Sequence, residues 1–362
     1  MSKKLNLIAP INPLGYGCVG MNMLKALFQQ NVEVAFWPIG APQVSSEEDA
    51  TYVRRGIENQ KTFCAAAQTL RIWHQHDMAQ SVGRGKRIGM PIFELDTFND
   101  VEKHNLKSLD HICVCSKWAK EIVDKQLDID TYVVPLGVDN KIFNAGESTI
   151  VGHQHNVTVF LNIGKWEKRK GHDILPEIFN RAFKSTDNVE LWMMNDSPFV
   201  NESDTNIWKQ KYTETEAGKK VRFFPRVEQH AEVANIMKAA DCGIFPSRAE
   251  GWNLEALEMM CCGKHVIISD CTAHQEFCDD SNSKLVEMGA LEEAHDGVWF
   301  GGQGKWSSIG DTQIDEFARH MREIHLLKQT GVLEPNTNGM KTAKQFDWAN
   351  SAKQFLFQCK IT

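Results

Sequence analysis

The chain has 362 residues, 42% of them hydrophobic, and a formal net charge of −7 at pH 7. This length has room for two domains of about 150–200 residues, and the negative balance gives no support to a general polyanion-binding role. The ten cysteines include no C-x-x-C pair, no apolar run nears about 18 residues, and the start MSKKLNLIAP lacks a signal-peptide core. We therefore expect a cytoplasmic protein, with peripheral attachment to a membrane left open.

The first 135 residues alternate between strand and helix patterns. Strands are predicted at 5–10, 32–39, 69–73, 88–94, 111–116 and 131–135, and helices at 21–29, around 105–109 and at 117–125. Gly15, Gly17 and Gly20 fall between the first strand and the first helix, where glycine lets the backbone approach a phosphate or sugar closely. A tight strand-to-helix turn explains the three glycines equally well.

The second part of the chain repeats the alternation after a polar stretch, 140–156, that we interpret as a linker. Strands are predicted at 157–164, 189–195, 221–225, 242–246 and 265–270, and an amphipathic helix at 346–358. Alternating strands and helices are typical of α/β domains with parallel sheets. We predict two Rossmann-like domains, at 1–145 and 157–345.

The stretch 242–270 carries the most chemical information. Glu250 and Glu258 lie eight positions apart, around a helix that Asn253 can cap and Gly263 can end. Glu250 precedes the helix and Glu258 lies about a turn and a half into it. The intervening amides, of Gly251, Trp252, Asn253 and Leu254, approach a positive helix N-terminus that suits a diphosphate. A solvated helix face is the alternative interpretation.

With its flanks, this stretch resembles the E-x7-E motif of the retaining glycosyltransferases of family 4, the group 1 glycosyl transferases. The resemblance implies the GT-B fold, in which two Rossmann-like domains face each other across a cleft and a C-terminal helix, here 346–362, crosses back to the first domain. It implies that Glu250 faces the transferred sugar and that Glu258 binds the donor ribose. The backbone amides near Asn253 and Leu254 would hold the diphosphate.

A second cluster, NIGKWEKRKGHD at 162–173, crowds cations at a strand-to-helix turn, where like charges repel unless an anion offsets them. Family 4 members carry a G-R…K-G signature here, which implies that Lys165 and Lys170 grip the donor diphosphate. Lysine at 165 keeps the charge of the family's arginine but loses its planar fork, and Arg169 could compensate. A surface loop of mixed charge is the alternative.

The family resemblance extends into the first part of the chain. It implies that a loop of Gly15, Tyr16 and Gly17 lines the cleft, and that a histidine of RIWHQHD (71–77) lies by the sugar. We favour His76 over His74. Glu94 could approach the acceptor, and a further signature has structural roles only, at Pro135, Gly137, Val138, Asp139 and Phe143.

Two other patterns are set aside. Asp128 and Asp130 form a D-x-D that could hold a divalent metal against a diphosphate, but they lie away from any glycine loop, so we expect a solvated loop and no metal site. Arg84, Lys86 and Arg87 form a basic spot that could touch an anionic acceptor, although three such charges are usually plain surface.

The resemblance therefore implies a retaining, metal-independent glycosyltransferase that moves a hexose from a nucleoside-diphosphate sugar to a hydroxyl of a glycan, a lipid or another acceptor. Its catalytic residues would be Glu250, His76 and Lys170, without a cofactor beyond the donor, for which a UDP-sugar is favoured. A DNA-modifying glycosyltransferase and a non-catalytic nucleotide-sugar-binding protein are the alternatives. The sequence leaves the acceptor, the sugar, the base and the oligomeric state open.

Overall fold

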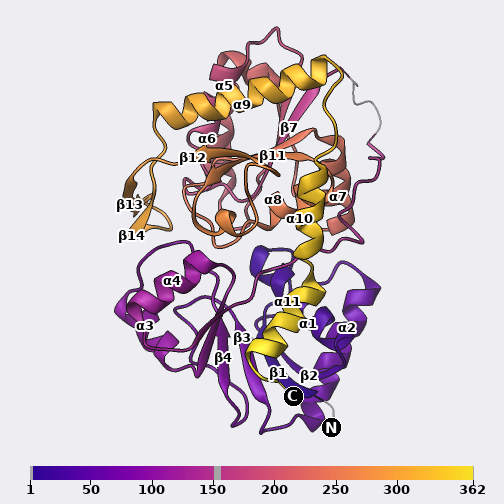
Figure 1. Ribbon diagram of the computed structural model, residues 1–362, viewed down its shortest axis with the longest axis vertical. Coiled ribbons are helices and arrows are strands. Elements are labelled where there is room, and N and C mark those ends of the chain that lie inside the picture. Colours follow the sequence, from indigo (N-terminus) through magenta and orange to yellow (C-terminus); the bar gives the residue numbers. More distant parts are fainter. Residues whose placement is uncertain (1–2, 151–155, 362) are drawn as a thin grey trace. The chain divides into compact units, whose positions relative to one another are not determined.

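A computed structural model describes residues 3–150 and 156–361 of the chain (Figure 1). It divides into two compact units: the first runs to Asp139 and resumes at Gln345, and the second is Asn140–Lys344. Residues 151–155 of the predicted linker lie outside the described residues, while its remainder belongs to the second unit.

The first unit is built on a six-stranded parallel sheet of order β2-β1-β3-β4-β5-β6. Its strands are β1 Lys3–Ala9, β2 Val32–Pro38, β3 Gln68–Ile72, β4 Arg87–Met90, β5 His111–Val114 and β6 Thr131–Val133. Its helices are α1 Gly15–Gln29, α2 Glu47–Glu58, the short 3-10 helix η1 Asn59–Thr62, α3 Asp100–Lys107, α4 Lys117–Gln126 and α11 Trp348–Gln358. The strands are nearly continuous apolar runs because helices cover both faces of such a sheet.

The last helix, α11, belongs to the first unit although it follows the second in sequence, and it packs on α1 (Figure 1). The segment before it is tied to the strand exit at 135–139: the amide of Val138 donates to the carbonyl of Phe346 at 2.9 Å. A Cβ on Gly137 would stand 2.4 Å from the amide nitrogen of Trp348, so only glycine permits this approach. Gly137 and Val138 therefore have a structural role, as expected: they hold the segment that leads into the C-terminal helix.

The glycines that we expected in a loop lie inside a helix. Helix α1 begins at Gly15, so Gly15, Tyr16 and Gly17 form its first turn and Gly20 its second, and the prediction of a helix starting at 21 was wrong. A Cβ on Gly17 would stand 2.2 Å from the carbonyl oxygen of Asn12, and one on Gly20 2.1 Å from that of Pro10. These glycines let the helix lie directly on the exit of β1, and tertiary contact overrides their poor helix propensity.

The second unit contains another six-stranded parallel sheet, of order β12-β11-β10-β7-β8-β9. Its strands are β7 Thr158–Ile163, β8 Val189–Met194, β9 Val221–Phe223, β10 Cys242–Phe245, β11 His265–Asp270 and β12 Lys284–Glu287, with an antiparallel hairpin of β13 Leu291–His295 and β14 Gly301–Ser307. Its helices are α5 Leu175–Ala182, α6 Glu202–Thr213, η2 Glu216–Lys220, α7 His230–Ala239, α8 Leu254–Cys261, η3 Thr272–Glu276, α9 Asp311–Gln329 and α10 Thr337–Gln345, the last ending at the boundary of the unit.

The core of the second unit lies between the sheet and helices α5 and α9. It is built from buried aromatic and aliphatic side chains of these elements and of the loop after β7, among them Phe160, Trp166, Phe179, Leu191 and Phe317. This core fixes the sheet on which the loops of the candidate site rest.

The chain reverses its direction across the sheet once in each unit. In the first unit β1 leads to β2 on one side and β3 lies on the other, and in the second β7 leads to β8 and β9 before β10 returns beside β7. Loops that leave the carboxyl ends of two strands at such a reversal diverge and leave room for a ligand. The loops after β7 and β10, and those after β1 and β3, are therefore the places to look for a site.

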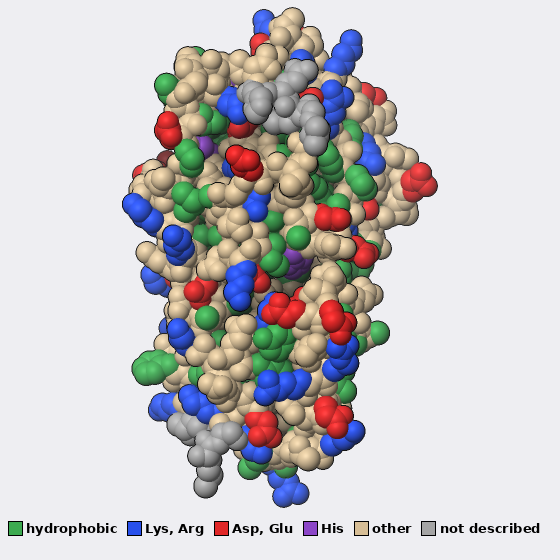
Figure 2. Space-filling model, turned by 90° about the vertical axis from the view of Figure 1, so that its right-hand side faces the viewer, with side chains coloured by type: hydrophobic (Ala, Val, Ile, Leu, Met, Phe, Trp, Pro, Cys, Tyr) green, Lys and Arg blue, Asp and Glu red, His purple; other side chains and the backbone are tan. Residues whose placement is uncertain are grey.

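The predicted α/β class with two parallel sheets is confirmed. The surface carries no single-signed expanse on the face drawn in Figure 2, where Lys and Arg side chains intermingle with Asp and Glu.

Candidate functional site

The loops after β7 and β10 meet at the reversal of the second sheet. Gly171, with φ +76°, lies against the Pro246 carbonyl so closely that a Cβ on the glycine would stand 2.1 Å from that oxygen. The amide of Arg248 donates to the carbonyl of Arg169 at 2.7 Å. These backbone contacts bring the cationic cluster at 165–170 onto the segment that carries Glu250.

Glu250 is buried and lies between two cations. Its Oε2 accepts from Nη1 of Arg169 at 2.8 Å, and its Oε1 accepts from Nζ of Lys170 at 3.0 Å and from Oγ of Ser247 at 2.9 Å. Burial would raise the pKa of this carboxyl, but the charges of Arg169 and Lys170 outweigh burial and hold the pKa well below its ordinary value. Glu250 is therefore ionised at neutral pH.

A second buried carboxylate, Glu167, extends this arrangement. Its Oε2 accepts from Nη2 of Arg169 at 2.9 Å, and its Oε1 lies 2.8 Å from Nζ of Lys165. Burial opposes ionisation of Glu167, yet the charges of Arg169 and Lys165 lower its pKa. Lys165, Glu167, Arg169, Glu250 and Lys170 thus form a chain of alternating charge, which we name the Glu250 network. Two carboxylates of the protein itself thus offset part of the positive charge of the crowded cations.

The two lysines of the Glu250 network differ in exposure. The side chain of Lys165 is 41% exposed and lies over the ring of Phe199, whereas that of Lys170 is 10% exposed. Burial would lower the pKa of Lys170, but the neighbouring charges of Glu250 and Glu255 raise it, so the ammonium stays protonated. The network carries three positive and two negative charges, and its excess of one positive charge favours an anionic ligand.

Helix α8 begins at Leu254, four residues after Glu250. Asn253 has φ +83°, and its Oδ1 accepts from the amide of Ala256 at 3.1 Å, as expected for the capping residue. The amide group of Asn253 is held by His274: Nδ2 lies 3.0 Å from Nε2 of the histidine, whose Nδ1 lies 2.8 Å from the carbonyl of Ser269. Burial lowers the pKa of His274 to about 4, so the imidazole is neutral, with Nδ1–H donating and Nε2 accepting.

The remaining predicted donor residues follow from this cap. Gly251 and Trp252 are buried between Glu250 and the cap, and Leu254 is the first residue of α8. Glu258, in the second turn of the helix, is partly buried. Burial, together with the negative charge of Glu255, raises the pKa of its carboxyl well above its ordinary value. Gly263, with φ +74°, follows the end of α8, as expected.

Several residues of the site escaped the sequence analysis. Glu167 pairs with Lys165, the Ser247 hydroxyl donates to Glu250, and Oγ1 of Thr272 accepts from the Glu250 amide at 2.9 Å. Arg248 braces both loops because its Nη1 and Nη2 donate to the two carboxylate oxygens of Asp173 at 2.8 and 2.9 Å. Glu167 and Asp173 stand inside the cationic motif, and that position was the one signal in the sequence that could have revealed them.

The corresponding reversal in the first unit gathers Tyr16, Trp73, His74 and His76. The Tyr16 ring lies 4.5 Å from the His74 ring, and the two histidine rings stack at 5.3 Å between centroids. The hydroxyl of Tyr16 donates to the Ile92 carbonyl at 2.6 Å, and burial raises its pKa well above the ordinary value. His74 is partly buried and His76 is exposed. The structure thus brings the predicted Tyr16 together with both candidate histidines.

The patterns that we set aside lie away from both reversals. Asp130 Oδ2 lies 3.6 Å from Nδ1 of His111, whose Nε2 lies 3.0 Å from Nζ of Lys86. In the described part of the chain, no three His, Cys, Asp or Glu side chains are grouped so that they could hold a metal ion. Nor is any helix there both long and apolar enough to pass through a bilayer.

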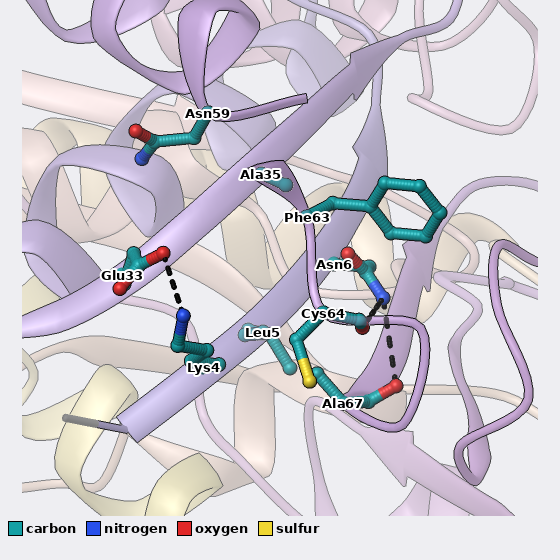
Figure 3. Close-up of a pocket in the computed structure, with 9 residues that line it drawn as sticks. All are labelled: Lys4, Leu5, Asn6, Glu33, Ala35, Asn59, Phe63, Cys64 and Ala67. Carbon is teal, nitrogen blue, oxygen red and sulfur yellow. Dashed lines mark hydrogen bonds and ion pairs between the residues drawn. The ribbon is translucent and has the colours of Figure 1, made fainter. Parts of the chain in front are cut away.

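A small hollow in the first unit lies beside the beginnings of β1 and β2 (Figure 3). Asn6 Nδ2 donates to the carbonyls of Cys64 and Ala67, each at 3.4 Å, and the Lys4 ammonium lies 3.0 Å from Glu33. The hollow contains no residue of either reversal and does not enlarge the candidate site.

The two parallel six-stranded sheets match the GT-B fold of solved glycosyltransferases. The chain is similar in structure to sucrose-phosphate synthase from Thermosynechococcus elongatus, with a TM-score of 0.70, 16% identity and coverage of 99% of this chain and 98% of that one. HepE from Anabaena, in complex with UDP-glucose, gives a TM-score of 0.70 with 13% identity and coverage of 99% of each chain. At these identities the likeness establishes the fold.

Residues 157–298 match the family described as "Glycosyl transferases group 1". The matched region holds the whole Glu250 network and Glu258. Among sequence relatives, the Escherichia coli UDP-Gal:alpha-D-GlcNAc-diphosphoundecaprenol alpha-1,3-galactosyltransferase is 31% identical over 189 residues, which are 48% of this chain and 46% of that protein. The chain thus spans about half the length of the sequence relatives that it matches.

Proposed function

We propose that the protein is a retaining glycosyltransferase that transfers a hexose from a nucleoside-diphosphate sugar to a hydroxyl acceptor without a metal ion. The observation that carries this proposal is the convergence of Lys165, Lys170 and Glu250 at the sheet reversal, where Glu250 lies four residues before the first residue of α8. Cations and helix amides suit a diphosphate, and carboxylates suit the hydroxyls of ribose and sugar. The match of residues 157–298 to group 1 glycosyl transferases supports the same function.

Each donor contact has a candidate in the second unit. The partly exposed Lys165 and the deeper Lys170 would bind the diphosphate, and so would the amides at the start of α8, of which only that of Ala256 is taken by the Asn253 side chain. Glu250 would accept from the sugar hydroxyls. Glu258 would accept from the ribose, and this contact would recover the cost of burying its carboxylate.

The reaction would proceed with little covalent help from the protein. The bond between the anomeric carbon and the diphosphate oxygen breaks, its electron pair stays on that oxygen, and the acceptor oxygen bonds to the same face of the sugar. The acceptor proton passes to the departing phosphate. Lys165 and Lys170 would stabilise the charge on the diphosphate as it departs, and loss of one such preorganised donor typically costs about 10²–10³ in rate. His76, on the first unit, would serve the acceptor side.

A UDP-sugar is the favoured donor. The E. coli relative is named for UDP-galactose, and a structural neighbour was solved with UDP-glucose. The acceptor is a hydroxyl of a glycan, a lipid or another molecule, and a cytoplasmic location remains our expectation.

Thermal unfolding in the presence of UDP, GDP, ADP and their glucose conjugates tests the proposal. A ligand that binds the native state raises the melting temperature by mass action. We expect one nucleoside diphosphate to stabilise the protein equally with magnesium and with a chelator, and Glu258→Ala to abolish most of that shift. No shift with any nucleotide would reject the function, a shift that needs magnesium would reject the metal-free mechanism, and binding without donor hydrolysis or transfer would favour a non-catalytic binding protein.

A further inference from the structure

Arg169 occupies the centre of the Glu250 network. It is 4% exposed, and its guanidinium donates on one side to Glu250 Oε2 at 2.8 Å and to the Ala249 carbonyl at 2.7 Å, and on the other to Glu167 Oε2 at 2.9 Å. Its planar guanidinium therefore joins two carboxylates from different loops. A lysine has a single ammonium group and could not replace both of these contacts.

The two lysines lie at the ends of the Glu250 network. Each carboxylate uses its second oxygen to hold one of them: Glu167 holds Lys165 at 2.8 Å, and Glu250 holds Lys170 at 3.0 Å. The positions of both ammonium groups thus depend on the positions of the two carboxylates, which Arg169 fixes relative to each other. The positive charge of Arg169 itself is shared between two anions, so little of it remains for a ligand.

We propose that Arg169 is a positioning residue that acts on the donor through Glu167 and Glu250, and that it does not bind the diphosphate directly. This inference rests on the proposed glycosyl transfer and deepens it: Lys165 and Lys170 are the cations that contact the donor, and the Arg169 guanidinium keeps them and Glu250 in the geometry that the transfer requires. Catalysis is more sensitive to such geometry than ground-state binding, because a small misplacement of reacting groups lowers the rate by up to about 10²-fold.

The test compares binding with turnover in Arg169→Lys, Arg169→Met and Lys165→Met. The probe is whichever of UDP, GDP and ADP binds the wild type, with its Kd measured by calorimetry, and turnover is the release of that nucleotide from its glucose conjugate. For Arg169→Met we expect turnover to fall by about 30-fold or more and the Kd to change by less than about threefold. Arg169→Lys retains the charge without the fork, and we expect it to recover only part of the turnover. Lys165→Met should weaken binding by about tenfold or more, because it removes a charge-assisted hydrogen bond to phosphate.

Three results would overturn the inference. In the first, Arg169→Lys loses affinity as strongly as Lys165→Met, which identifies Arg169 as a direct phosphate ligand. In the second, Arg169→Lys equals the wild type in turnover. In the third, the binding stoichiometry and turnover of the Arg169 variants fall in the same proportion, which indicates partial unfolding. If Arg169→Met does not fold, Arg169→Lys alone decides the question, because the first two results are defined on that variant. Failure of the wild type to bind any of the three nucleotides would instead reject the proposed function.

Discussion

Gly171 and Pro246 touch at the reversal of the second sheet, where a Cβ on the glycine would stand 2.1 Å from the proline carbonyl oxygen. Gly171 follows Lys170 directly, and Pro246 lies four residues before Glu250. This backbone contact therefore sets the distance at which Lys170 and Glu250 can pair. The sequence Lys170-Gly171 thus has a physical reason. Lys170 reaches the Glu250 carboxylate because the next residue lacks a side chain.

Gly171→Ala is expected to destabilise the second unit strongly. An alanine at φ +76° is strained by about 1–2 kcal/mol, and the clash with Pro246 adds to that cost, for a total of about 3 kcal/mol or more. Gly331→Ala is the matched control, because Gly331 has φ +73° in the same unit but no atom within 4 Å of an added Cβ. It should lose only the strain of about 1–2 kcal/mol. Denaturant unfolding measures the free energy of unfolding of both variants. Equal losses would show that the backbone at Pro246 moves aside for the added Cβ at little cost.

Much of the second unit's site could be predicted because its signals are local. Asn253 and Gly263 mark the two ends of α8 by short-range capping, and the cationic motif and the glutamate pair are visible as spacings. The pairing of Arg169 with Glu250 could not be predicted, because these residues are about 80 positions apart and only the strand order brings them together.

In the first unit, by contrast, local sequence signals failed to predict the start of a helix. Gly15, Gly17 and Gly20 indicate a loop by propensity, yet they lie in α1 because the exit of β1 presses against the helix and leaves no room for a Cβ at Gly17 or Gly20. Propensity describes an isolated segment, and here a contact outside that segment decides its structure.

Glu250→Gln is expected to cost about 3–5 kcal/mol in the free energy of unfolding at pH 7, because it leaves the buried Arg169 and Lys170 without their shared anion. The pKa of Glu250 is lowered, so its contribution is present above the unfolded-state pKa of about 4.5 and is lost as the pH falls below it. The difference between wild type and variant should therefore shrink between pH 5 and pH 3.

Glu255→Gln is the matched control for this prediction, since Glu255 is a nearby, partly buried glutamate outside the Glu250 network. It should change the stability at pH 7 by less than about 1 kcal/mol. A Glu250→Gln variant as stable as the wild type at pH 7 would contradict the ion pairing described here. Turnover of Glu250→Gln should fall more than its affinity for the nucleotide.

Two fully buried histidines make the second unit sensitive to acid. Burial, reinforced by the charge of Lys170, lowers the pKa of His172 to about 3, and burial lowers that of His274 to about 4. Unfolding raises both toward the ordinary 6.5, so the unfolded chain binds more protons and stability falls as the pH drops from 6.5 to 4. At pH 5 the pair should contribute a slope of about 2.5 kcal/mol per pH unit.

His274→Gln isolates one of the two contributions. Glutamine offers a donor for the Ser269 carbonyl and an acceptor for Asn253, which replaces both hydrogen bonds of the neutral imidazole. Denaturant unfolding at pH 7 and pH 5 should show the loss of stability between the two pH values reduced by about 1.8 kcal/mol. An unchanged slope would mean that His274 is protonated in the folded protein.

Glu258→Gln is expected to stabilise the free protein and to weaken ligand binding. Burial and Glu255 raise the pKa of Glu258, so its contribution to stability is complete below pH 4.5 and is lost as the pH rises through the folded-state pKa. The amide avoids that loss, so the variant should match the wild type near pH 4 and exceed it at pH 8. The affinity for the nucleoside diphosphate should fall by about tenfold or more, because a carboxylate that accepts from ribose hydroxyls is replaced by a neutral group. Residues kept at a cost in stability are typical of binding sites. A variant that gains stability and binds the nucleotide as tightly as the wild type would remove Glu258 from the site.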